Sequence, residues 1–196
     1  MSDEIPHVIA VAGPNGSGKT SRAPKVLREL FGLTDYVNAD VIAQGLSAFR
    51  PETVAFDAGR VMLRRLHKLS AARQSFAFET TFAGRAHARW IERNKTESGY
   101  EFHIMYLWLR SPELAVQRVR QRVRQGGHDI PDEVVRRRYA SGVRNFFGLY
   151  RPLANSWGLY DNSVYNNPHM VAIGGENMET RVFDEQVWRQ FCEAAK

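Results

Sequence analysis

Eight residues near the start of the chain could hold a polyphosphate. They read Gly13-Pro14-Asn15-Gly16-Ser17-Gly18-Lys19-Thr20, which is the spacing G-x-x-x-x-G-K-[ST]. Glycines tolerate positive φ angles, so the backbone N–H groups of such a loop can converge on an anion. The lysine would reach the β- and γ-phosphates, and the threonine hydroxyl would hold Mg²⁺. We therefore expect this segment to bind ATP and Mg²⁺ through Gly13, Asn15, Gly16, Ser17, Gly18, Lys19 and Thr20, with Lys19 exposed in the loop rather than packed.

The segments that flank this loop have the character that the motif requires. Residues 8–12 are a short apolar run rich in β-branched side chains, as in a buried strand. Residues 21–33 place apolar side chains at helical spacing, and the positive end of that helix dipole would face the anion. A glycine-rich turn without a ligand is the alternative. The order of strand, loop and helix disfavours it.

Two carboxylates follow predicted strands and could act beside the loop. Asp40 ends the stretch 36–40, and Glu79 lies near the end of the apolar run 75–82. Because the carboxyl ends of parallel strands meet the ligand crevice, both side chains could reach Mg²⁺ or a substrate hydroxyl. Asp40 has a second interpretation on spacing alone, as the N-cap of a helical turn over residues 41–43.

Arginines gather on two predicted helices in the second half of the chain. The first covers about residues 112–124, and successive residues on it are about 100° apart. This rotation divides its arginines into two rows, of which one should face the cleft: Arg118 with Arg122, and Arg120 with Arg124. A glycine pair at 126–127 separates it from a second helix over 132–147. We expect residues 118–138 to form a lid that closes over phosphates; a solvated basic hairpin is the alternative.

The remaining elements complete an α/β domain. Helical spacing recurs over 52–72, 85–95 and 182–195, and apolar strands are expected over 102–109 and 170–173. Residues 157–163 are ambiguous between strand and turn. His103, in the predicted fourth strand, is interpreted as an internal residue rather than a ligand. The pattern predicts one three-layer P-loop NTPase domain over residues 1–196, of the nucleoside or small-molecule kinase type, with a mainly parallel sheet, helices on both faces and a helical lid.

Composition restricts the setting in which the chain acts. Its 196 residues are 43% hydrophobic, no apolar run reaches the ~20 residues of a membrane span, and the acidic start lacks a signal-peptide pattern. The single cysteine, Cys192, excludes an internal disulfide and fits a reducing compartment. The net charge is +6 and most cations are arginines, which suits a polyphosphate or nucleic acid. We expect a cytoplasmic protein with no membrane contact.

Several short motifs, taken in order along the chain, resemble the zeta-toxin family. Besides the phosphate loop they are Asn38-Ala39-Asp40, Phe78-Glu79-Thr80-Thr81, Ser111-Pro112-Glu113-Leu114 and Gly126-Gly127-His128-Asp129-Ile130-Pro131, all within roughly residues 8–165. The chain looks most like the chromosomal branch of short, stand-alone predicted ATPases. Zeta toxins phosphorylate a sugar hydroxyl of UDP-N-acetylglucosamine with ATP and are held inactive by a small antitoxin. The resemblance implies a hydroxylated small-molecule acceptor, UDP-sugars among the candidates, and an antitoxin partner.

The resemblance also implies roles for individual residues. The expected catalytic set is Asp40 as the base, with Lys19 and Arg122 stabilising the transferring phosphoryl group. Thr20 is the expected metal ligand. The expected ATP contacts outside the loop are Arg118, Arg122 and His128. The expected substrate-binding residues are Asn38, Asp40, Arg60, Glu79 and Thr81.

Two positions depart from the family pattern. His128 stands where the toxins have a second lid arginine, and it is a weaker, pH-dependent cation. Arg137 or Arg138 could substitute for it. Leu63 stands where the toxins carry a substrate-binding carboxylate.

Three hypotheses for the function follow. The first is a kinase that moves the γ-phosphoryl group of ATP to a hydroxyl of a small molecule, with Asp40 accepting the hydroxyl proton. The second is an ATP-dependent nucleic-acid binder that uses the basic hairpin. It is disfavoured because, near residues 118–138, only Tyr139 could stack on a base. The third is a nucleotide-gated regulatory module that binds ATP without phosphoryl transfer.

Overall fold

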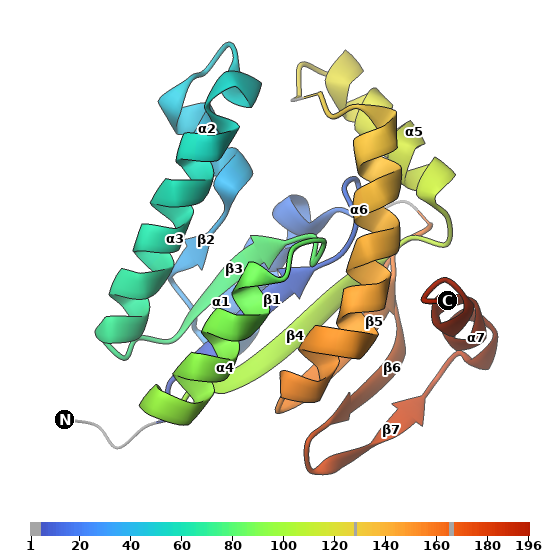
Figure 1. Cartoon of the computed structure of the whole chain (residues 1–196). Coiled ribbons are helices and arrows are strands. Elements are labelled where there is room, and N and C mark those ends of the chain that lie inside the picture. Colours follow the sequence, from blue (N-terminus) through green and yellow to red (C-terminus); the bar gives the residue numbers. More distant parts are fainter. Residues whose placement is uncertain (1–4, 128, 165–166) are drawn as a thin grey trace.

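The computed structural model describes the chain apart from residues 1–4, 128 and 165–166 (Figure 1). Within the described part, a sheet of seven strands has the order β2-β3-β1-β4-β5-β6-β7. The strands are β1 (His7–Ala12), β2 (Tyr36–Val37), β3 (Phe76–Thr80), β4 (Glu101–Trp108), β5 (Ser156–Asp161), β6 (His169–Gly175) and β7 (Met178–Val182). The pairs from β2 to β5 are parallel, and β6 and β7 are antiparallel additions. The expected mainly parallel sheet is confirmed.

Helices alternate with these strands along the chain. They are α1 (Lys19–Phe31), α2 (Ala39–Leu46), α3 (Ala55–Ala71), α4 (Ala86–Ser98), α5 (Pro112–Arg124), α6 (Asp132–Asn145) and α7 (Glu185–Glu193). Shorter turns of helix cover Pro51–Val54, Phe146–Tyr150 and Arg151–Leu153. None of the described helices is long and apolar enough to span a membrane.

The sheet separates two apolar clusters, which makes the domain three-layered as expected. One face of β1, with Ile9 and Val11, packs against Ala23 and Leu27 of α1. The other face packs against α3, α4, α6 and α7, and Figure 1 shows α1 behind the sheet with α3, α4 and α6 in front. The end of β4, Tyr106 to Trp108, is buried on both faces and is apolar throughout, whereas Glu101, His103 and Met105 earlier in the strand are only partly buried.

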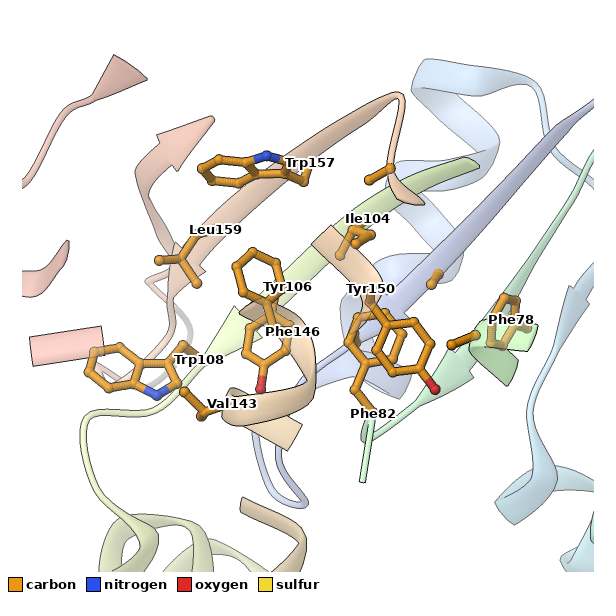
Figure 2. Packing of buried hydrophobic residues seen from close by; sticks show 14 of the residues in the cluster. Phe78, Phe82, Ile104, Tyr106, Trp108, Val143, Phe146, Tyr150, Trp157 and Leu159 are labelled. Carbon is orange, nitrogen blue, oxygen red and sulfur yellow. The ribbon is translucent and has the colours of Figure 1, made fainter. Parts of the chain in front are cut away.

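Aromatic rings fill the larger cluster (Figure 2). Phe146, which is fully buried, lies 5.1 Å from the Tyr106 ring, 5.3 Å from Phe191 and 5.8 Å from Trp157, measured between ring centroids. Edge-to-face pairs of this kind are favourable beyond the area that they bury. Phe146, the residue directly after α6, thereby joins the end of that helix to β4, β5 and α7.

Two elements differ from the prediction. Asn38, Ala39 and Asp40 were expected to extend a strand, but Ala39 and Asp40 begin α2, because the Asn38 side chain caps the first N–H groups of that helix. The terminal helix was expected from residue 182, but it begins at Glu185, where Asp184 caps it. Residues 178–182 form the edge strand β7, whose side chains are mostly exposed and so lack an alternating apolar pattern. The ambiguous stretch after residue 156 is strand β5.

Replacing Phe146 tests the role of the aromatic cluster. We expect Phe146→Ala to lower the free energy of unfolding by roughly 3–5 kcal/mol, because it removes a ring from a closely packed site. Phe49→Ala is the matched control: Phe49 is 98% exposed, and its loss should change stability by less than about 0.5 kcal/mol. Urea denaturation measures both, and equal losses in the two variants would contradict the assignment.

Candidate active site

The loop between β1 and α1 has the backbone that an anion-binding loop needs. Gly13, Gly16 and Gly18 have φ angles of 138°, 79° and 85°, which residues other than glycine rarely adopt. Space is also limited, since a Cβ atom at Gly13 would lie 2.0 Å from the Leu107 carbonyl oxygen. At Gly16 it would lie 3.0 Å from the Ala115 carbonyl oxygen of α5. The glycines therefore allow the loop to pass between the end of β4 and α5.

Lys19 is buried beneath this loop, with 5% of its surface exposed, so the expectation of an exposed side chain was wrong. Side chains in the first turn of a helix point back toward its N-terminus, which directs Lys19 across the loop. Its Nζ donates to the carbonyl oxygens of Gly13 and Pro14, at 2.9 Å each, and lies 3.8 Å from Oε1 of Glu79. Burial lowers the pKa of Lys19, while the carboxylates of Glu79 and Asp40 oppose that shift.

Glu79, in β3, is the carboxylate on which the site's donors converge. Its Oε2 accepts hydrogen bonds from Thr20 Oγ1 at 2.9 Å, Tyr36 OH at 2.7 Å and Asn38 Nδ2 at 2.7 Å. The parallel register of β2 and β3, with Val37 opposite Phe78, places Asn38 beside Glu79. Burial raises the pKa of the Tyr36 phenol, and the charge of Glu79 adds to that rise, so the phenol remains a donor. Sequence reasoning found Glu79 and missed Tyr36.

Asp40 lies in the first turn of α2, next to the same group. Asn38 Oδ1 accepts hydrogen bonds from the backbone N–H of Asp40 at 2.7 Å and of Val41 at 3.4 Å. The cap is therefore Asn38, and the interpretation of Asp40 as an N-cap was wrong. Asn and Asp are equally good caps, so spacing alone could not choose between them. The half-buried Asp40 side chain is left to line the neighbouring cavity.

That cavity, of about 550 Å³, lies beside the carboxyl ends of β1, β2 and β3. It is bounded by the phosphate loop, by α2 and α3, and by α6. Of the residues that the sequence proposed, it brings together Asn15, Lys19, Asn38, Asp40, Arg60, Glu79 and Thr81. It also includes Leu63, His87 and Arg138. Arg138 was named only as a substitute lid cation, and His87 was not foreseen because it lies on a helix with no motif.

The arginines of α5 divide as the helix geometry requires. Arg118 packs against Gly16: a Cβ atom added to Gly16 would lie 3.0 Å from the Cβ atom of Arg118. Nη2 of Arg118 donates to the Ser163 carbonyl oxygen at 2.8 Å. Arg122 lies near enough to Lys19 for its charge to lower the lysine pKa, as does Arg138. Arg120 is exposed and is paired with Asp132, and Arg124 is also exposed. The other lid candidate, His128, falls outside the described residues.

A polar pair lies at the end of β5, where one member holds the phosphate loop from the other side, and sequence reasoning missed it. Asn162, 3% exposed, donates through Nδ2 to the Ser17 carbonyl oxygen at 2.8 Å. Asp161, also buried, accepts from Arg110 Nε at 2.7 Å. Asp161 ends β5 and Asn162 follows it directly, as Asn38 follows β2. The same strand-end rule would have found them, had residues 157–163 been assigned to a strand.

The segment after β3 is fixed to α6. A Cβ atom on Gly142 would lie 2.4 Å from the Thr81 carbonyl oxygen, so only glycine allows α6 to come this close. Asn145 Nδ2 donates to the Phe82 carbonyl oxygen at 2.7 Å. Phe82 has a φ angle of 57°, and its ring is stacked on Tyr150 at 3.7 Å between centroids (Figure 2). The strained backbone is thus held by packing on one side of the cavity.

The residues present fit a bound Mg²⁺ and phosphate. Thr20 Oγ1 lies 2.9 and 3.1 Å from the two Glu79 oxygens, and Mg²⁺ is held by oxygen ligands of this kind. The buried Ser17 hydroxyl and Asn15 Oδ1 have no hydrogen-bond partner among the described residues. Buried polar atoms are normally paired, so an unpaired hydroxyl in a glycine-rich loop is consistent with an external ligand.

Removing the charge of Glu79 tests its role as the shared acceptor. We expect Glu79→Gln to lower the free energy of unfolding by about 2–4 kcal/mol, because the amide cannot accept all the donors or balance buried Lys19. Glu92→Gln, at an exposed position of α4, should change it by less than about 0.5 kcal/mol. Thermal and urea unfolding in the absence of nucleotide measure both. A silent Glu79→Gln would show that the donors do not depend on this carboxylate.

Known proteins share both the sequence and the fold of this chain. An uncharacterized protein of Haemophilus influenzae is 30% identical over 135 residues, which are 67% of this chain and 91% of that protein. The structure of AvrRxo1-ORF1:-ORF2 with ATP superposes with a TM-score of 0.73 at 18% identity, covering 96% of this chain. This chain spans 64% of that longer chain.

The PezAT chromosomal toxin–antitoxin system of Streptococcus pneumoniae gives a TM-score of 0.67 at 17% identity, covering 100% of this chain and 86% of that one. At the level of the fold, the resemblance to zeta-toxin-like P-loop kinases is thereby confirmed. The model of the AAA_33 family, described as an AAA domain, matches residues 8–144, from β1 into α6. The chain therefore belongs to this family of AAA domains.

Proposed function

We propose that this protein is a kinase that transfers the γ-phosphoryl group of ATP to a hydroxyl group of a small molecule. The observation that carries the proposal is the cavity of about 550 Å³, where Asp40 lies with Asn15 and Lys19 of the phosphate loop. A nucleotide on the loop would present its terminal phosphate to this space, and an acceptor in the cavity would meet it there.

The two carboxylates of the site have different hydrogen-bonding environments, which supports different roles. Glu79 accepts from Thr20, Tyr36 and Asn38 and is ion-paired with Lys19, so its oxygens are already engaged. No hydrogen bond joins the Asp40 carboxylate to another side chain in the part of the chain that the structure describes. Asp40 is therefore the carboxylate available to accept the proton of an acceptor hydroxyl.

Cations around the loop would balance the charge of the transferring group. Lys19 is held at the loop, and the charges of Arg122 and Arg138 act on it from α5 and α6. Thr20 and Glu79 would hold Mg²⁺, which when bound neutralises part of the phosphate charge. The helices α5 and α6 would close over the nucleotide as a lid and exclude water, which otherwise competes as an acceptor.

The lining of the cavity favours an acceptor that carries negative charge as well as a hydroxyl. Arg60 and Arg138 both line it, and guanidinium groups bind phosphates and carboxylates in two-point contacts. UDP-N-acetylglucosamine is the candidate that the zeta-toxin resemblance supplies. Leu63, at a position where those toxins have a carboxylate, lines the same cavity, so we propose the acceptor class rather than that nucleotide sugar alone.

We further propose that the protein acts in the cytoplasm and that a small antitoxin-like protein can bind it. The support for the partner is the fold: two of the similar structures are the AvrRxo1-ORF1:-ORF2 complex and the PezAT toxin–antitoxin system. Incubating the chain with ATP and pools of cytoplasmic metabolites would identify the acceptor by a mass gain of one phosphate. A pool that shows no such product, while ATP is bound, would favour the regulatory-module hypothesis.

Asp40→Asn separates the base from the nucleotide site. We expect ATP affinity close to that of the wild type and phosphoryl transfer slower by at least ~10²-fold, the scale of a positioned base. Lys19→Met should instead abolish ATP binding, and methionine rather than alanine keeps the volume of this buried side chain. Calorimetric ATP titration and product formation measure the two effects. Lost ATP binding in Asp40→Asn would make Asp40 a magnesium or structural residue.

Arg122→Ala tests the lid. A cation that acts on the transferring phosphoryl group should lower kcat by ~10³-fold while the KM for the acceptor changes little. Arg120→Ala is the matched control on the same helix, and its exposed pairing with Asp132 should contribute little. Steady-state kinetics decide between them. If Arg120→Ala is the damaging change, the proposed orientation of α5 toward the phosphates is wrong.

A further inference from the structure

Three side chains with metal-binding atoms meet on the surface of the sheet, at the opposite ends of the strands from the phosphate loop. His7 begins β1, and Glu101 and His103 lie two residues apart at the start of β4. In the parallel register His7 lies opposite Glu101, and Ile9 lies opposite His103. Residues two apart on a strand share a face, so the sheet presents all three side chains on the same side.

The ligand atoms form a compact triangle. His7 Nδ1 lies 3.0 Å from His103 Nε2, and Glu101 Oε2 lies 3.6 Å from each of these nitrogens. Metal–ligand bonds of about 2.0–2.1 Å in a tetrahedral site place the ligand atoms roughly 3.3–3.4 Å apart. Each edge of the triangle is within a few tenths of an ångström of that value. The three side chains can therefore bind one ion with small rotations.

The surroundings orient the His103 ring and hold the backbone of His7. His103 Nδ1 lies 2.8 Å from Ser156 Oγ of β5, and donation from Nδ1 leaves the lone pair of Nε2 directed at the triangle. The His7 backbone N–H donates to Ser75 Oγ at 2.9 Å, which fixes the start of β1. Metal-binding histidines commonly have a hydrogen bond on the second ring nitrogen, as His103 has with Ser156.

We propose that His7, Glu101 and His103 bind Zn²⁺, with a fourth coordination position that is open. Two imidazoles and one carboxylate suit Zn²⁺, whereas Mg²⁺ and Ca²⁺ take oxygen ligands. His7, His103 and Ser156 also line a cavity of about 750 Å³, which gives a water molecule or another small ligand room beside the ion. The ion would join β1 to β4 far from the proposed phosphoryl-transfer site, and its binding does not depend on that function.

The competing arrangement needs no metal: a protonated imidazole would share the carboxylate of Glu101. Titration of the full chain with Co²⁺ separates the two, because four-coordinate Co²⁺ has intense visible absorption and six-coordinate Co²⁺ does not. The chain should carry no histidine tag, and excess Mg²⁺ should be present to occupy the oxygen ligands at Thr20 and Glu79. We expect a single Co²⁺ per chain with tetrahedral absorption, displaced by Zn²⁺.

Matched variants locate the ion. The tetrahedral spectrum should be lost in each of the ligand variants His7→Ala, Glu101→Gln and His103→Ala. Ser156→Ala should keep the tetrahedral spectrum but weaken the affinity for Co²⁺ by ~10–100-fold. His67→Ala, at an exposed position of α3, should leave both unchanged. Circular dichroism checks that each variant is folded, and His7, which is 41% exposed, can be replaced without opening the core. An absent tetrahedral spectrum, or one that survives in folded His7→Ala and Glu101→Gln, would overturn the proposal.

Discussion

The arrangement of the candidate active site depends on one partly buried carboxylate that several elements share. Glu79 of β3 accepts from Thr20 of α1, from Tyr36 of β2 and from the cap residue of α2. Without it Tyr36 and Asn38 would each lose an acceptor at 2.7 Å, and buried Lys19 would lose the carboxylate with which it is paired. Because three elements converge on the same two oxygens, the phosphate loop and the start of α2 keep one relative position. The cavity lies between these two segments, so its shape and the place of Asp40 in it depend on that relative position.

The same carboxylate explains how two acidic groups a short distance apart can differ chemically. Donors surround Glu79, whereas the Asp40 side chain reaches the cavity from a helix whose capping is done by Asn38. The oxygens of Glu79 already accept several hydrogen bonds, whereas the Asp40 carboxylate has none to another described side chain, and this difference supports the separate roles proposed for them. The sequence shows two carboxylates at strand ends but does not indicate which of them accepts hydrogen bonds from other side chains. The structure shows that Glu79 does.

What the sequence predicted follows local rules, and what it missed depends on packing. The glycine spacing and the flanking strand and helix predicted the loop, and the strand-end rule predicted Glu79. The burial of Lys19 was not predictable in this way, because it arises from the position of the loop carbonyls over the first turn of α1. The hydrogen bond of Tyr36 requires the register of β2 on β3, and that of Asn162 requires β5 beside the loop. Strand β7 is an exposed edge, where apolar periodicity is absent.

The contact of Gly142 with Thr81 has a mechanical consequence. Because the backbone of α6 touches the carbonyl oxygen of Thr81, and Asn145 binds the next residue, the C-terminal half of this helix is anchored to the segment beside the cavity. Any rotation of the α5–α6 hairpin must therefore be centred near Gly142, and the arginine-bearing ends of the two helices would move furthest. An acceptor that shifts Thr81 would move α6 close to this centre, so that a small shift there would produce a larger one at the arginines. If the chain is the kinase proposed above, binding of an acceptor and coverage of the nucleotide would be coupled through the uncharged contact of Gly142 with Thr81.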